Sequence, residues 1–129
     1  MEEILPRLWL SDSLDGWAAS RSGSHYVINV ADMEMNRLAD INIPMVKMWR
    51  ADDEVMVPRI TLEIVVHAIH CACTMQPLPV LVHCQAGIER SPLAVTAYVA
   101  MMRGVTMAEA FAIVAAKRPQ VSNCLDWVK

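Results

Sequence analysis

One short stretch of the sequence, Pro79 to Pro92, constrains the fold of the chain most strongly. It begins with an apolar run over residues 80–82, two of them β-branched, which is typical of a buried strand. It leads into a second apolar segment, Leu93–Met102, which predicts a helix. Between the two lies a tight loop that starts at Cys84 and ends at Arg90. The sequence therefore predicts a strand, a loop and a helix, with a cysteine and an arginine at the two ends of the loop.

The composition of this loop favours an anion-binding site. Backbone N–H groups that curl between a strand and a helix N-terminus converge on an anion, and the helix dipole adds positive potential. Gly87 allows the turn without a Cβ clash, and the Arg90 guanidinium can donate to two oxygens of a tetrahedral anion. The same field stabilises a thiolate at Cys84, which would be a nucleophile placed for attack on phosphorus. The alternative, a buried core thiol with Arg90 as a helix cap, does not explain these offsets.

The order of residues around the loop, His83-Cys84-x5-Arg90-Ser91, resembles the signature H-C-x5-R-[S/T] of the cysteine-dependent protein tyrosine phosphatase superfamily. The fuller run V-L-V-H-C-Q-A-G-I-x-R-S most resembles the dual-specificity branch of that superfamily. The I-L-P-R-L-W-L opening and the R-P-x-V-S segment after residue 117 are also similar to dual-specificity phosphatase domains. The resemblance implies a minimal PTP-like phosphatase fold of the α/β class, with a central, mostly parallel, twisted sheet of four to five strands flanked by helices.

The 129 residues are expected to form a single domain, residues 1–129, with a core of ordinary size. Local patterns and turn residues predict further strands over 4–10, 26–30 and 43–48, and helices over 14–20, 59–74, 91–103 and 106–117. Thr106 and Glu109 form a capping box at the start of the last of these helices, and Gly104 ends the helix before it. The resemblance implies one more helix near the C-terminus, which we expect to be short or missing because the sequence stops at Lys129.

Composition and charge argue against several classes of protein. Hydrophobic residues make up 55% of the chain, but no apolar run is as long as a membrane span, and the acidic N-terminus lacks the basic start of a signal peptide. A formal net charge of −3 argues against a nucleic-acid partner. A reducing, cytoplasmic location fits best, because a cysteine nucleophile must stay reduced.

A group of metal-ligand residue types lies in the helix predicted before the central strand: His67, His70, Cys71 and Cys73. His67 and Cys71 share one face of this helix at a spacing of four residues. No second pair of ligands at zinc-like spacing follows elsewhere, so we expect an ordinary half-buried helix and no metal.

The resemblance assigns roles to the residues around the loop. It implies that Cys84 is the nucleophile and that His83 orders the loop from a buried position. Ser91 donates to the thiolate and helps it leave when water hydrolyses a cysteinyl-phosphate. The resemblance implies no metal and no organic cofactor. The phosphate is held by the backbone of the loop and by the arginine, that is, by Gln85, Ala86, Gly87, Ile88, Glu89 and Arg90.

The resemblance also implies a general acid, an aspartate in the loop before the helix that precedes the catalytic strand. The acidic run here is Asp52-Asp53-Glu54. We expect the acid to be Asp53, which lies 31 residues before Cys84, with Asp52 as the alternate. A solvated acidic loop without a catalytic role is the other interpretation.

The substrate class follows from the charges of the loop, which contains no lysine. Glu89 would repel additional phosphates on a polyanion, which disfavours phosphoinositides and RNA ends. The expected partner is therefore a phosphorylated protein or peptide, and we expect no nucleic acid or membrane partner. The short chain leaves little room for the long loops of a deep, phosphotyrosine-only pocket, so we expect a shallow pocket and hydrolysis of both phosphotyrosine and phosphoserine/threonine. Two alternatives stay open, a phosphatase for a non-protein phosphoester and a non-enzymatic phosphate-binding pseudophosphatase. The sequence does not predict the oligomeric state.

Overall fold

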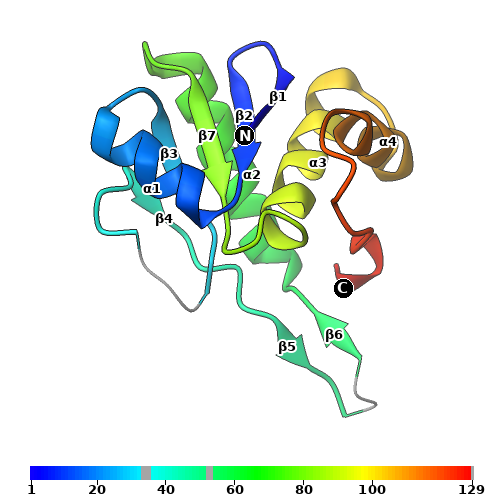
Figure 1. Cartoon of the computed structure of the whole chain (residues 1–129). Coiled ribbons are helices and arrows are strands. Elements are labelled where there is room, and N and C mark those ends of the chain that lie inside the picture. Colours follow the sequence, from blue (N-terminus) through cyan, green and yellow to red (C-terminus); the bar gives the residue numbers. More distant parts are fainter. Residues whose placement is uncertain (33–35, 52–53, 129) are drawn as a thin grey trace.

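A computed structural model describes residues 1–32, 36–51 and 54–128 of the chain (Figure 1). The chain contains both helices and strands, as expected of the α/β class. Their bounds are β1 Glu2–Leu5, β2 Leu8–Ser11, α1 Ser13–Ser22, β3 Tyr26–Asn29, β4 Ile41–Asn42, β5 Met48–Trp49, β6 Val55–Met56, α2 Arg59–Met75, β7 Val80–His83, α3 Arg90–Arg103, α4 Met107–Lys117 and the 3-10 helix η1 Leu125–Trp127.

A five-stranded sheet in the order β1-β2-β7-β3-β4 forms the centre of the molecule. The strands β2, β7, β3 and β4 are parallel, and only β1 runs antiparallel to its neighbour. All four residues of β7 are buried, and His83 at its end is paired in register with both Ser11 and Asn29. The predicted fold class, a mostly parallel sheet of four to five strands with flanking helices, is confirmed.

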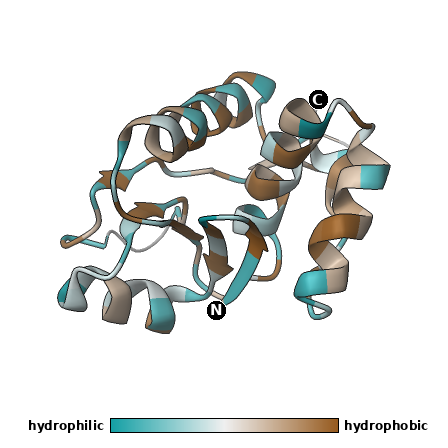
Figure 2. Ribbon diagram, turned by 90° about the horizontal axis from the view of Figure 1, so that it is seen from above, coloured by the Kyte–Doolittle hydropathy of each residue, from teal (hydrophilic) through white to brown (hydrophobic). Residues whose placement is uncertain are grey.

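The two faces of the sheet pack against different helices because successive side chains along a strand point to opposite faces. Val27 and Leu81 pack with Ala19 of α1 on one face. On the other face Ile28 and Val82 belong to the larger core, to which α2, α3 and α4 also contribute. Figure 2 shows the hydrophobic strands between these two layers of helices.

The helix ends follow the local signals in the sequence. The Asp12 side chain caps α1 by accepting from the backbone N–H of Asp15 at 3.0 Å. Thr106 and Glu109 form the predicted capping box at the start of α4. Gly104 ends α3 with a φ of 64°, the left-handed conformation that glycine adopts without a Cβ clash.

The predicted strand over Ile43–Met48 is wrong. The N–H groups of Ile43 and Met45 still donate to carbonyls of Asn29 and Val30, at 2.9 and 3.1 Å, but no strand continues beyond β4. Pro44 lies between these two donors, on the side of the edge strand that faces away from β3, so its missing N–H removes no bond of this ladder. The chain then leaves the main sheet and forms a separate hairpin, in which β5 pairs antiparallel with β6.

The described residues contain no single helix that is long and apolar enough to cross a membrane. Only α3 and α4 taken together meet the requirements of length and composition, and they are bent by 118° at their junction.

Gly16 of α1 packs directly against the ring of His83, and we predict that Gly16→Ala destabilises the fold. A Cβ at this position would lie 2.3 Å from His83 Cδ2 and 2.4 Å from Cγ. We expect the free energy of unfolding in urea to fall by about 1–3 kcal/mol, because overpacking a buried contact forces its neighbours to move. Ala18→Gly, at an exposed position of the same helix, is the control and should cost about 1 kcal/mol through helix propensity alone. Wild-type stability of Gly16→Ala would contradict this packing.

Candidate active site

The residues of interest meet at the carboxyl edge of the parallel strands. Cys84 directly follows β7, Asp12 directly follows β2, and Asp32 comes three residues after β3. The carboxyl ends of neighbouring parallel strands share one edge, and ligands of open α/β sheets bind there. The topology therefore gathers these three segments around the loop between β7 and α3.

Every backbone carbonyl of this loop, from Cys84 to Glu89, accepts a hydrogen bond. The carbonyl of a planar trans peptide points away from its N–H group, so carbonyls held outward turn the N–H groups inward. The loop is thereby shaped as an anion-binding nest. The donors are His83 Nδ1 to Cys84 (3.0 Å), Ser13 N to Gln85 (2.9 Å), Arg118 Nη2 to Ala86 (3.4 Å), Arg118 Nε to Gly87 (2.9 Å), Ser122 N to Ile88 (2.8 Å) and Leu93 N to Glu89 (3.1 Å).

The Cys84 sulfur lies inside this nest and accepts two hydrogen bonds. Ser91 Oγ donates to Sγ at 3.1 Å, and the Gly87 N–H donates at 3.3 Å. Cys84 is 2% exposed and Ser91 is fully buried. Both donors favour a negatively charged sulfur, and the contact expected between Ser91 and the thiolate is present.

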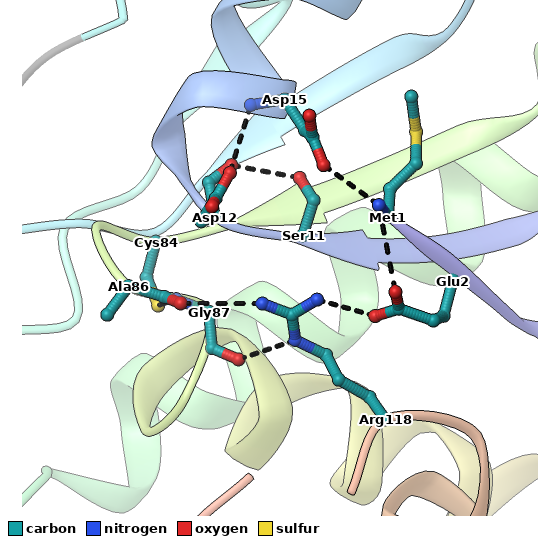
Figure 3. A network of polar contacts seen from close by, with 9 residues as sticks. All are labelled: Met1, Glu2, Ser11, Asp12, Asp15, Cys84, Ala86, Gly87 and Arg118. Carbon is teal, nitrogen blue, oxygen red and sulfur yellow. Dashed lines mark hydrogen bonds and ion pairs between the residues drawn. The ribbon is translucent and has the colours of Figure 1, made fainter. Parts of the chain in front are cut away.

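Arg118 holds the outer side of the loop (Figure 3). Its guanidinium lies between the carbonyls of Ala86 and Gly87 on one side and the Glu2 carboxylate on the other, with Nη1 2.5 Å from Oε1. Gly87 has a φ of 69°, and a Cβ there would lie 2.6 Å from Arg118 Nη2 and 2.7 Å from the Ser11 carbonyl oxygen. Only glycine fits this close approach of three segments.

Arg90 lies at the start of α3 and is 7% exposed. Its Nη1 donates to the Asp32 carboxylate, and the two side chains form an ion pair. Arg90 Nε is buried and has no hydrogen-bond partner among the described residues. A buried guanidinium N–H without an acceptor is costly, and an anion in the nest would relieve that cost.

His83 is a fixed, neutral part of the site. The Asn36 amide nitrogen donates to Nε2 at 3.2 Å, and its orientation is set because Asn36 Oδ1 accepts from the Leu38 N–H at 3.1 Å. Nδ1 must therefore carry the hydrogen that it donates to the Cys84 carbonyl. Burial lowers the pKa of His83, against the opposing effects of that carbonyl and of Asp12. The supporting role expected for His83 agrees with this geometry.

Glu89, the acidic side chain of the loop, is not isolated. Its Oε1 is 3.2 Å from Lys47 Nζ, and Nζ also lies 5.0 Å from the centre of the Trp127 ring. Lys47 belongs to the segment before β5, and Trp127 belongs to η1. Lys47 therefore partly neutralises the negative charge of Glu89, which we expected to repel additional phosphates on a substrate.

The predicted general acid, Asp53, and its alternate, Asp52, lie outside the described residues. Of the acidic run, Glu54 is described; its backbone carbonyl accepts from the Arg50 N–H at 2.9 Å. The assignment of the acid therefore stays a prediction.

Sequence reasoning missed four residues that build the site, namely Asp32, Asn36, Lys47 and Arg118. A signal was available for Asp32, because it follows the end of a strand that pairs with the catalytic one. Arg118 stood in a motif that resembles the family, but its contact with the loop depends on the return of the chain after α4. Lys47 and Asn36 carry no local signal for their roles, since the site residues that they contact, Glu89 and His83, lie more than 40 residues away.

Helix α2, which contains the metal-ligand residue types, supplies none of the hydrogen bonds to the loop carbonyls. His67 Nε2 lies 3.5 Å from Cys71 Sγ, and no group of three or more His, Cys, Asp or Glu residues within the described chain could hold a metal ion. A groove of about 470 Å³ lies beside this helix, between α2, α3 and the C-terminal segment. None of the residues that line the groove belongs to the loop between β7 and α3, residues 84–89.

Comparison with known proteins identifies the class. Residues 18–129 match the family described as "Dual specificity phosphatase, catalytic domain". The chain belongs to this family, within the dual-specificity branch of the protein tyrosine phosphatase superfamily, as the loop motif predicted.

Individual relatives agree with the family. The chain is 29% identical over 121 residues to human dual specificity protein phosphatase 15, covering 92% of this chain and 40% of the relative. It is 28% identical to dual specificity protein phosphatase Mpk3 of Drosophila melanogaster, covering 93% of this chain and 30% of the relative. The chain thus spans less than half the length of these curated relatives.

Solved structures show the same fold. A crystal structure of DUSP15 superposes with a TM-score of 0.72 and 26% identity, covering 92% of this chain and 76% of that one. Human DUSP28 gives a TM-score of 0.73 with 23% identity, covering 96% of this chain and 87% of the other.

The contacts of Arg118 predict that it is needed both for stability and for anion binding. Arg118→Met removes the donors of two loop carbonyls and leaves the Glu2 carboxylate with the N-terminal ammonium of Met1 as its remaining partner among the described residues. We expect the free energy of unfolding to fall by about 2–3 kcal/mol, and the Kd of inorganic phosphate, measured by calorimetry, to rise at least about tenfold. Glu2→Gln is the matched control: it keeps both loop contacts and should cost less than about 1 kcal/mol, since Glu2 is partly exposed. Equal losses for the two variants would show that the loop does not depend on Arg118.

Proposed function

We propose that the protein is a cysteine-dependent phosphatase that hydrolyses phosphotyrosine and phosphoserine/threonine in proteins through a cysteinyl-phosphate. One observation carries this proposal: the Cys84 sulfur lies in a nest of inward-facing amides, and the buried Arg90 Nε at the same loop has no hydrogen-bond partner among the described residues. A phosphate monoester supplies acceptors for the amides and for the guanidinium together. Membership of the dual-specificity phosphatase family, and the names of the relatives, support the same activity.

In the first step the Cys84 thiolate attacks phosphorus, and the S–P bond forms while the P–O bond to the leaving group breaks. Arg90 and the loop amides stabilise the negative charge on the three phosphoryl oxygens, and they are already positioned before the substrate arrives. The leaving oxygen takes a proton from the general acid, for which we propose Asp53. Protonation matters most for a serine or threonine alkoxide, which leaves poorly as an anion.

In the second step water attacks the phosphorus of the cysteinyl-phosphate and gives a proton to the same aspartate, now a base. The S–P bond breaks, inorganic phosphate is released, and the sulfur recovers its negative charge. Ser91 Oγ, 3.1 Å from Sγ, donates to the departing sulfur and lowers the cost of that charge. Because the thiolate must stay reduced between turnovers, we expect the protein to work in a reducing compartment such as the cytoplasm.

Two variants test the roles of the nucleophile and the arginine. We expect Cys84→Ser to abolish hydrolysis of an aryl phosphate while phosphate still binds, because the nest is made of backbone and Arg90. Arg90→Lys should lose both, with kcat/KM falling by about 10²–10³-fold, because a point charge cannot replace the planar fork. Turnover is measured by release of phosphate and binding by calorimetry. If the wild-type protein does not exceed Cys84→Ser, the enzyme proposal fails and a phosphate-binding module takes its place.

The general acid is tested by the pH dependence of kcat for Asp53→Ala and Asp52→Ala. A general acid must be protonated, so wild-type activity should decline as the pH rises and the acid loses its proton. We expect Asp53→Ala to lose about 10²-fold in kcat and to lose this decline, whereas Asp52→Ala keeps the wild-type profile. The reverse pattern would assign the acid to Asp52, and two wild-type profiles would show that neither aspartate serves.

The substrate class is tested by comparing phosphopeptides with a phosphoinositide headgroup and a nucleotide monophosphate. We expect kcat/KM to be highest for the phosphopeptides. A higher value for either small molecule would support a phosphatase for non-protein phosphoesters instead.

A further inference from the structure

We propose that Lys47 and Glu89 together determine which charges a substrate can carry beside its phosphate. In this inference, which rests on the proposed function, Lys47 neutralises Glu89, the acidic side chain of the loop between β7 and α3. Glu89 in turn keeps the ammonium group of Lys47 from binding another anion. The entrance to the nest is thereby kept near neutral, and it favours a single phosphate without a second anion next to it.

The geometry shows that Lys47 is held from two sides. Its ammonium group donates to Glu89 Oε1 at 3.2 Å and lies 5.0 Å from the centre of the Trp127 ring, within the range of a cation–π interaction. Three segments that are far apart in the sequence contribute side chains to this contact: the stretch before β5, the loop before α3, and η1. The backbone N–H of Val57 also donates to the Trp127 carbonyl at 2.7 Å, so η1 is tied to the other side of the β5–β6 hairpin as well.

The position of Glu89 makes its charge matter for phosphate binding. Glu89 precedes Arg90 directly, so the two Cα atoms are about 3.8 Å apart. Its side chain makes no capping hydrogen bond at the start of α3, so its contact with Lys47 is not replaced by a structural one. An uncompensated carboxylate at this place would repel a phosphate dianion, and the repulsion would be reduced by salt.

The thiol of Cys124 lies in the same small region as both charges. Burial, followed by Glu89 and Asp126, raises the pKa of Cys124 to about 11, and Lys47 opposes this rise. Cys124 lies two residues after Ser122, whose N–H donates to the Ile88 carbonyl of the loop. The charges of Lys47 and Glu89 therefore act together near the segment, Ser122 to Cys124, that holds the Ile88 carbonyl.

The pair itself contributes little to the stability of the fold. The side chains of Lys47 and Glu89 are 30% and 39% exposed, and exposed ion pairs add little to stability. Variants of these two residues should therefore fold, which makes their effect on binding measurable.

The first experiment measures phosphate binding in a double-mutant cycle with Lys47→Gln, Glu89→Gln and the double variant. All proteins carry Cys84→Ser, so the Kd of inorganic phosphate does not depend on turnover. We expect Lys47→Gln to raise the Kd about 3–10-fold at low salt, and less at high salt. The double variant should return to within about twofold of the starting protein, because the repelling carboxylate is then gone. Lys117→Gln, at an exposed position of α4, is the control for the loss of one positive charge.

The second experiment uses active protein and two phosphopeptides that differ only in having neutral or acidic residues beside the phosphorylated one. Glu89→Gln frees the ammonium of Lys47 to bind a second anion. We expect this variant to raise kcat/KM for the acidic peptide about 3–10-fold relative to the neutral one, through KM. Lys47→Gln should shift the preference in the opposite direction.

The outcomes separate this inference from the proposed function. If Lys47→Gln leaves the Kd unchanged, or raises it equally with and without Glu89, then Lys47 does not act by neutralising Glu89 and the inference is wrong. Unchanged peptide preference in Glu89→Gln also overturns it. A wild-type protein that binds phosphate but does not hydrolyse it would refute the enzyme proposal, while the binding cycle would still decide the role of the pair.

Discussion

The site depends on the outward hydrogen bonding of one loop. Six consecutive carbonyls, from Cys84 to Glu89, are held by donors that come from β7, α1, α3 and the segment after α4. Because the peptide unit is planar, these bonds also direct the N–H groups toward the inside of the loop, the geometry of an anion-binding nest. Folding thus supplies the free energy needed to gather these N–H groups in one place before any ligand binds. This is preorganisation of the kind that stabilises developing charge in a transition state.

Arg118 and Arg90 have different roles on the two sides of this loop. Arg118 is buried on the outer side, where all of its contacts serve the backbone and Glu2. Arg90 is buried on the inner side, where Asp32 holds one end of the guanidinium and Nε is left without a partner among the described residues. One arginine therefore shapes the nest, and the other is available to the ligand. The pair of Lys47 with Glu89 adds a third, more exposed interaction beside this loop.

Local signals account for much of the fold. The buried run of β7, the capping box at Thr106 and the glycine after α3 each act within a few residues, and the structure confirms the elements that they predict. The strand predicted over Ile43–Met48 failed because the pairing with β3 does not continue beyond Met45, and Met48 and Trp49 pair with β6 instead. That choice of partner is a tertiary event, which apolar alternation alone could not reveal.

The sequence by itself determined which chemical groups meet in the loop, because the cysteine, the glycine, the arginine and the serine all lie within eight residues. Groups so close in sequence are brought together by a single local turn of the backbone. Tertiary structure decided everything that reaches the loop from outside. Asp32 meets Arg90, Asn36 meets His83, and Glu2 meets Arg118 across as many as 116 residues. Such contacts depend on which strands become neighbours and on where the chain returns after each helix. The physical reason is that a carboxylate or an amide pairs with whatever charge or donor the folded chain brings within about 3 Å, and local sequence does not encode that distance.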